Sequence, residues 1–254
     1  MLHTIADLQT ESASSRLDTI REARSYMDEA IFNYDQSRLG KSTGRSKFCF
    51  HPSELYMCKR RLWYCYAGIN DENTIEPSLQ EIFDIGHNYH AIVQRKVLKA
   101  IPAAGGEFYS EVPVGGTPLG REWEIQGSAD GLIIAPTFRM ILEIKTISEK
   151  GISTLSKPQA PHITQASIYA TLLDAPLILF YYISKQNGRG KQFVVQTEKA
   201  SFAEVTHTID YVRNAIARQQ IPQRMTKKYA CKTCPFAHTC FDDKEWGDFA
   251  DVEQ

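Results

Sequence analysis

Four segments of the chain carry apolar residues at the three- and four-residue spacing that places them on one face of a helix. They cover residues 14–38, 77–100, 160–173 and 201–219. The second segment is expected to end before Pro102, because a proline inside a helix removes a backbone hydrogen bond. The spacing therefore predicts three long helices and one shorter helix.

Short runs rich in strand-forming residues lie between these helical segments and are separated by glycine and proline turns. A continuous apolar run at 177–183 is typical of a buried strand, and Asn187 and Gly188 after it are typical of a hairpin turn. The order of elements predicts an α/β fold, with a mixed central sheet flanked by helices. The other strands are predicted at 108–114, 121–125, 131–134, 140–147 and 192–196.

The composition is that of a globular protein with one domain, or one domain and an appendage. Of the 254 residues, 43% are apolar and 23% are charged. No apolar run approaches the roughly 18 residues that span a bilayer, and the N-terminus lacks the basic and apolar regions of a targeting signal. We therefore expect a cytoplasmic protein that does not contact a membrane. The formal net charge of -1 gives no general attraction to nucleic acid, so DNA binding would need local basic patches.

A carboxylate and an ammonium group share one face of the strand predicted at 140–147. Side chains alternate along a strand, so Glu143 and Lys145 lie on the same side. Such a pair alone is common on a solvated strand face. Asp130 changes this interpretation, because a hairpin between its strand and the Glu143 strand brings both carboxylates side by side. Adjacent carboxylates repel unless a cation lies between them, and hard oxygen ligands favour Mg2+ or Mn2+.

The six cysteines include a Cys-x2-Cys-x5-Cys run near the C-terminus, formed by Cys231, Cys234 and Cys240. Cytoplasmic thiols stay reduced, so this spacing indicates a metal site and not disulfides. His238 inside the run is a possible substitute ligand. The upstream candidates for a fourth thiolate are Cys49, Cys58 and Cys65. Four thiolates hold either an iron-sulfur cluster or Zn2+, and the spacing favours the cluster because zinc sites more often use two paired Cys-x2-Cys units.

Four short motifs follow one another along the chain. They are Gly-x-x-x-His at 86–90, Gly-Ser-Ala-Asp at 127–130, Glu-x-Lys at 143–145 and Gln-x-x-x-Tyr at 165–169. With these motifs, the chain resembles the RecB-like branch of the PD-(D/E)XK nucleases, and within it the CRISPR-associated and phage exonucleases that carry an iron-sulfur cluster. The resemblance runs over most of the chain from Cys58 to Cys240. It departs from the family at Lys59, where the family's cysteine signature has a proline.

This resemblance implies a role for each matching residue of the nuclease motifs. Lys145 would be the catalytic lysine. Gln165 and Tyr169, which share a helix face because they are four residues apart, would contact DNA or steady the site. The implied ligands of Mg2+ or Mn2+ are His90, Asp130, Glu143 and the carbonyl group of Ile144.

The resemblance also implies how the chain is divided. A 4Fe-4S cluster, with Zn2+ as the alternative, would be held by Cys58 together with Cys231, Cys234 and Cys240, in a subdomain built from both ends of the chain. The core would have the restriction-endonuclease-like PD-(D/E)XK fold. The expected parts are an N-terminal helix and basic connector at 1–47, an iron-sulfur subdomain at 48–75 and 222–254, and a nuclease core at 76–221.

The function implied is that of a metal-dependent exonuclease that hydrolyses phosphodiester bonds at single-stranded DNA ends. The setting would be DNA repair, recombination, phage DNA metabolism or CRISPR adaptation, with a helicase or other DNA-processing protein as partner where duplex must be unwound. The alternatives are a structure-selective endonuclease and a catalytically silent DNA-binding module. The candidate DNA-contacting residues are the basic Arg60, Arg61, Lys185, Arg189 and Lys191.

Overall fold

The computed structural model describes residues 13–38, 49–69, 77–197, 199–225, 231 and 234–241. Backbone contacts divide the chain into two units, Met1–Gly44 with Thr74–Glu81 and Arg45–Asn73 with Ile82–Gln254. All of the candidate site residues belong to the second unit. Among the described residues, no helix is long and apolar enough to cross a membrane.

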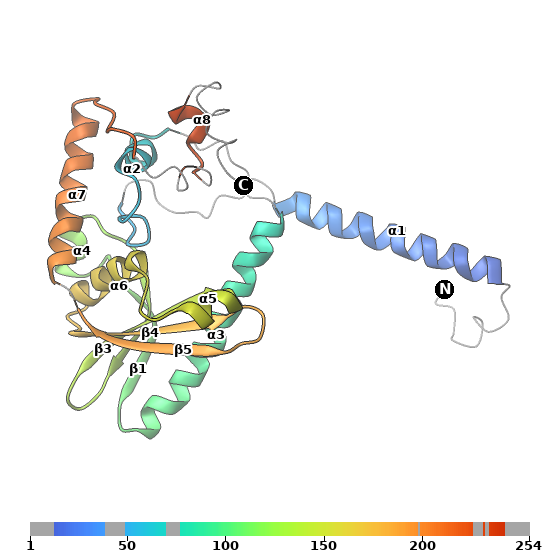
Figure 1. Ribbon diagram of the computed structural model, residues 1–254, viewed down its shortest axis with the longest axis horizontal. Helices are drawn as coiled ribbons and strands as arrows, with labels where there is room; N and C mark the ends of the chain where they lie inside the picture. Colours follow the sequence, from blue (N-terminus) through green and yellow to red (C-terminus); the bar gives the residue numbers. More distant parts are fainter. Residues whose placement is uncertain are drawn as a thin grey trace. The chain divides into compact units, whose positions relative to one another are not determined.

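Within the described residues, five strands form one sheet: β1 (Glu107–Pro113), β2 (Ser128–Ile134), β3 (Arg139–Ile147), β4 (Leu177–Ser184) and β5 (Gly190–Gln196) (Figure 1). The strands lie side by side in the order of the sequence, so β3 is the middle strand. Neighbouring strands are antiparallel, except that β3 and β4 are parallel. The mixed sheet predicted from the sequence is confirmed.

Helices cover both faces of this sheet. Val93 on one side is buried with Leu142 and Ile144 of β3. Ile168 and Ile209 on the other side are buried in a second core. The middle strand is therefore shielded from solvent on both faces. The helices are α1 (Ala13–Arg38), α2 (Lys59–Tyr66), α3 (Pro77–Ala103), α4 (Pro118–Glu122), α5 (Glu149–Thr154), α6 (Ala160–Leu172), α7 (Lys199–Ala217) and α8 (Ala237–Cys240). Val93 belongs to α3, Ile168 to α6 and Ile209 to α7.

The strand predicted at 121–125 is wrong, because α4 covers its first residues. The Thr117 side chain accepts a hydrogen bond from the backbone N–H of Gly120, and Pro118 takes the first helical position, which together begin a helix. Ile125 forms only an isolated bridge with Phe50. The strand-forming residues at 121–125 therefore do not decide the local structure, because the cap at Thr117 begins a helix just before them.

The end predicted for the second helix is also wrong, because Pro102 lies inside α3. A proline there removes the hydrogen bond to the carbonyl group four residues earlier. That carbonyl group belongs to Leu98, a residue that is 54% exposed in the last two turns of α3. The loss costs little near a solvated helix end.

The helix predicted at 14–38 is confirmed as α1, which belongs to the first unit. Its apolar residues Tyr26, Met27, Ile31 and Phe32 are all more than half exposed. The basic connector predicted to follow it, up to residue 47, lies outside the described residues.

Candidate active site

The candidate catalytic side chains gather where β2 and β3 stop pairing. The last paired residues are Gly131 and Leu142, so the next step along the register brings Asp130 opposite Glu143. There the Asp130 carboxylate accepts a hydrogen bond of 2.6 Å from the backbone N–H of Ile144. A side chain thus takes over from the backbone ladder, and the two carboxylates come together at the middle of the sheet.

Glu143 and Lys145 share one face of β3, and this face is not a solvated one. Glu143 is only 1% exposed, because α6 covers it. The Lys145 ammonium lies 2.7 Å from Glu143 Oε1 and donates a hydrogen bond of 3.0 Å to Gln165 Oε1 on α6. Burial raises the pKa of Glu143 although the Lys145 charge opposes it. Burial lowers the pKa of Lys145, but the charge of Glu143, the hydrogen bond to Glu143 and the charge of Asp130 together outweigh it, so the pKa is raised overall.

His90 reaches the same place from α3. Its Nδ1 lies 3.2 Å from Asp130 Oδ1. Burial lowers the pKa of His90, but the hydrogen bond to Asp130 and the Asp130 charge outweigh it and raise the pKa overall. The structure therefore brings together His90, Asp130, Glu143 and the backbone of Ile144, which are the four metal ligands that the sequence resemblance implies.

The donor set fits a hard divalent cation. Both carboxylate oxygens of Glu143 are buried and, apart from the ion pair with Lys145, have no hydrogen-bond partner among the described residues. A buried carboxylate that lacks donors is costly unless a positive charge compensates it. In the described part of the chain, no three His, Cys, Asp or Glu side chains already lie close enough to hold a metal ion. The protein donors Lys145 and Ile144 engage the two carboxylates instead.

Tyr169 on α6 packs against Gly127, three residues before Asp130. Its side chain is 5% exposed, and a Cβ atom placed on Gly127 would lie 3.1 Å from its hydroxyl oxygen. Gly127 has a φ of 152°, so both its conformation and the contact favour glycine. Of the two roles expected for Tyr169, this position favours steadying the segment that carries Asp130.

Sequence reasoning missed Gln94, which lies one turn after His90 on α3. Its Nε2 donates hydrogen bonds of 2.9 Å to the Asp130 carbonyl oxygen and of 2.7 Å to Glu111 Oε1. Glu111 on β1 has a left-handed φ of 51°, which is uncommon for a residue other than glycine. The four-residue spacing from His90 was a usable signal for Gln94, whereas nothing in the sequence marks the backbone of Glu111.

The four cysteines selected by the resemblance line one pocket of about 470 Å³. Arg60 Nη1 donates to Cys240 Sγ at 3.5 Å. Burial raises the pKa of Cys231 and of Cys234, and the neighbouring thiols raise both further. Mutual repulsion of this kind is relieved when thiolates bind a metal. The cysteines that line this pocket are Cys58, Cys231, Cys234 and Cys240, and Cys49 and Cys65 do not belong to the lining.

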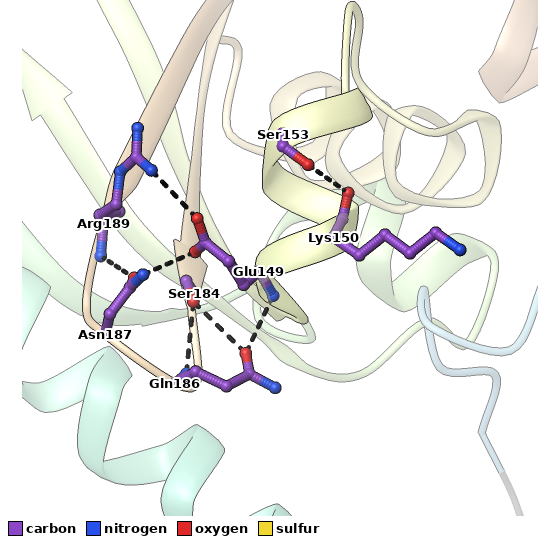
Figure 2. A network of polar contacts seen from close by, with 7 residues as sticks. All are labelled: Glu149, Lys150, Ser153, Ser184, Gln186, Asn187 and Arg189. Carbon is purple, nitrogen blue, oxygen red and sulfur yellow. Dashed lines mark hydrogen bonds and ion pairs between the residues drawn. The ribbon is translucent and has the colours of Figure 1, made fainter.

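The β4–β5 hairpin, which carries three of the candidate DNA-contacting residues, is tied to α5. Figure 2 shows that Glu149 binds both Asn187 and Arg189, with distances of 2.8 Å to Asn187 Nδ2 and 3.1 Å to Arg189 Nη1. The Lys191 ammonium donates to the Leu155 carbonyl oxygen at 2.5 Å. The charges of Arg189 and Lys191 are thus partly used inside the protein, which leaves Lys185 as the least engaged of the three.

The remaining two candidates lie beside the cysteine pocket. Arg60 donates through Nε to the Pro222 carbonyl oxygen at 2.7 Å, in addition to its bond to Cys240. Arg61 lines the same pocket. The Arg60 guanidinium therefore contacts a cysteine sulfur, and the Arg61 charge opposes the burial that raises the pKa of Cys234, as expected where positive charge stabilises thiolates.

Comparison with known proteins identifies the fold. A sequence model of the PD-(D/E)XK nuclease superfamily matches residues 95–241. The crystal structure of SSO0001 is similar with a TM-score of 0.51 and 18% identity, over 77% of this chain and 87% of that chain. An alkaline exonuclease (LHK-Exo) from Laribacter hongkongensis has a TM-score of 0.48 and 14% identity, over 74% of this chain and 93% of its own. No curated protein matches the sequence.

Proposed function

This protein belongs to the PD-(D/E)XK nuclease superfamily, and we propose that it hydrolyses DNA phosphodiester bonds with the help of Mg2+ or Mn2+. The motif resemblance favours exonucleolytic cleavage from single-stranded ends. The observation that carries the proposal is the buried Glu143 carboxylate, which lies opposite Asp130 and beside the Lys145 ammonium. A buried carboxylate whose single partner is one ammonium group is costly for stability, so burial of this kind favours a functional role.

The residues that would hold the cation come from three elements. Asp130 lies on β2, next to the last residue that pairs with β3. Glu143 lies on β3, and His90 lies on α3. The carbonyl oxygen of Ile144 is the fourth expected ligand. A cation bound there supplies a Lewis acid for the scissile phosphate and promotes ionisation of the attacking water.

Lys145 is held so that it can act on the same reacting group. An ammonium has three N–H donors, and Glu143 and Gln165 account for two of them. One donor remains for a phosphoryl oxygen or for the attacking water. Its charge would stabilise the negative charge that develops on the phosphoryl oxygens during hydrolysis. Gln165 orients Lys145, and Tyr169 keeps the Asp130 segment in place.

The test is cleavage of labelled DNA by the purified protein. Single-stranded, double-stranded and circular DNA are incubated with Mn2+, with Mg2+ or with a chelator, and the products are separated by size. Metal-dependent release of mononucleotides from linear single strands is the expected result. Cleavage of circular DNA would instead support the structure-selective endonuclease. Binding without cleavage under every metal condition would contradict the proposal and support the silent binding module.

We further propose that Cys58, Cys231, Cys234 and Cys240 hold a 4Fe-4S cluster, with Zn2+ as the alternative. Two features support a four-thiolate centre: all four cysteines are among the residues that line one pocket, and Arg60, Arg61 and Arg224 line it as well. Cationic side chains compensate the negative charge of thiolates. The expected role is structural, because the centre would join the segment before α2 to the C-terminal segment.

A further inference from the structure

His162 on α6 lies close to Lys145, the proposed catalytic lysine on β3. It lies three residues before Gln165, so both side chains project from the same side of the helix. Gln165 accepts the hydrogen bond from Lys145, and the Lys145 charge also acts on the His162 ring. In the sheet, Tyr182 of β4 is the register partner of Lys145. His162 and Tyr182 therefore form a second layer of polar groups beside Lys145, which the motifs do not include.

The hydrogen bonds of Tyr182 determine which nitrogen of His162 carries hydrogen. Tyr182 Oη accepts the backbone N–H of Gln159 at 3.1 Å and lies 2.8 Å from His162 Nδ1. Tyr182 is fully buried, and no other acceptor for its hydroxyl hydrogen exists among the described residues. The hydroxyl therefore donates to Nδ1, so that a neutral His162 must carry its hydrogen on Nε2.

The neutral ring is also the favoured one. Burial and the Lys145 charge lower the pKa of His162 to about 4. With Nδ1 accepting from Tyr182, Nε2–H is a donor and offers no lone pair to a metal ion. The ring is partly exposed, and within the described part of the chain Nε2 has no hydrogen-bond partner. The structure thus holds an unused donor next to Lys145 without adding a second positive charge that would repel it.

We propose that His162 binds the DNA backbone, with Nε2–H donating to a phosphodiester oxygen next to the bond that is hydrolysed. This inference rests on the proposed nuclease function. His162 lies in the first turn of α6, where the positive end of the helix dipole also favours an anion. Tyr182 is the positioning residue, because its hydroxyl keeps the hydrogen of His162 on the nitrogen that faces away from Tyr182.

Two variants separate DNA binding from a structural role of His162. The amide of asparagine reaches the position of Nδ1, so His162→Asn keeps the acceptor for Tyr182 and loses the outer donor. The amide of glutamine reaches the position of Nε2, so His162→Gln keeps the outer donor. Binding of a labelled single-stranded oligonucleotide is measured by fluorescence anisotropy with a chelator present, and thermal unfolding is measured in parallel.

We expect His162→Asn to weaken binding by roughly ten- to a hundredfold, the effect of losing a hydrogen bond to a charged group. His162→Gln should stay within roughly threefold of the unmodified protein. The reverse order, with His162→Asn unchanged and His162→Gln impaired, is the result of a purely structural role and would overturn the inference. Equal affinity of all three proteins would overturn it as well.

A modified substrate tests the same contact without changing the fold. Oligonucleotides with one neutral methylphosphonate linkage at successive positions are compared on the unmodified protein and on His162→Asn. One position should weaken binding to the unmodified protein and have no further effect on the variant. If every position affects both proteins equally, the inference is wrong. Because binding is measured without metal, this pattern would support the DNA contact even if cleavage assays contradicted the nuclease function.

Discussion

The two candidate centres of this protein are built in opposite ways. At the active site, Asp130 and the Ile144 N–H that it binds are 14 residues apart and belong to neighbouring strands. At the cysteine pocket, Arg60 and the Cys240 sulfur that it contacts are 180 residues apart. The first centre is positioned by a backbone register inside the sheet. The second depends on bringing the two ends of the second unit together.

This difference predicts how each centre responds to a substitution. The strands around Glu143 are held by hydrophobic cores on both faces, so a polar change there should alter chemistry more than folding. The cysteine pocket is lined by short segments that include the four-residue helix α8. Such segments have little core of their own, and a metal centre would contribute directly to their folding.

The largest effect is expected from Glu143→Gln, which keeps the shape of the side chain and removes its charge. Cleavage should fall on the order of a thousandfold or more, because the cation loses an anionic ligand. The variant should still fold, but its melting temperature should fall, because the buried Lys145 ammonium loses its charged partner. Glu149→Gln, on the exposed network of Figure 2, is the matched control and should keep its activity. Unchanged cleavage by Glu143→Gln would exclude the metal role of this residue.

The next largest effect is expected from changing a cysteine of the pocket, which should alter both the visible absorbance and the yield of folded protein. The protein should be brown when purified, because thiolate-bound iron absorbs visible light and zinc does not. Cys58→Ser should remove the absorbance and reduce the yield of soluble protein. Cys49→Ser is the matched control, because Cys49 is buried outside the pocket lining, and it should remain coloured. A colourless protein that contains zinc would show that the four cysteines hold Zn2+ and not an iron-sulfur cluster. Loss of colour in Cys49→Ser but not in Cys58→Ser would show that Cys58 is not the fourth ligand.

A smaller effect is expected from Gln94→Met, which keeps the size of the side chain and removes both of its hydrogen bonds. Asp130 would lose the bond that holds its backbone, and we expect the cleavage rate to drop roughly tenfold. The melting temperature and the visible spectrum should be unaffected. Arg95→Met on the same helix is the control, because the hydrogen bond that the Arg95 side chain makes within the described part of the chain is to the Ala91 carbonyl oxygen of its own helix. A Gln94→Met rate equal to that of the control would exclude this positioning role.

The smallest effect is expected from deleting residues 1–40, which include α1. The motifs and both centres belong to the second unit, so metal-dependent cleavage should remain within roughly twofold of the full chain. We expect the exposed apolar residues of α1 to serve assembly or contact with a partner protein. A truncated protein that is folded and coloured but inactive would contradict this division of labour.

The juxtaposition of Asp130, Glu143 and Lys145 could be predicted from the sequence, because it depends on local order. Alternation along β3 placed Glu143 and Lys145 on one face, and the hairpin placed Asp130 beside them. The burial of that face was not predictable, because α6 covers it. The alternation of residues along β3 does not show which helix packs on the sheet. The contacts of Gln94, Glu111 and His162 also depend on tertiary packing.

Elements with competing local signals were harder to predict. Residues 121–125 have the composition of a strand, but the cap at Thr117 and Pro118 begins a helix there. The short α5 was missed, although Ser148 caps it by accepting from the Gly151 N–H. In both cases a side-chain hydrogen bond to the backbone decided the local structure, which periodicity alone does not reveal.

The most direct test of the proposed nuclease is the rate of DNA cleavage by Lys145→Ala under single-turnover conditions with saturating Mn2+. Removal of one preorganised charge should slow cleavage on the order of a hundredfold, or about 3 kcal/mol of barrier. DNA binding, visible absorbance and the activity of Lys99→Ala, an exposed lysine on α3, should be preserved. Cleavage by Lys145→Ala at the unmodified rate would contradict a catalytic lysine and leave the pair with Glu143 a structural ion pair.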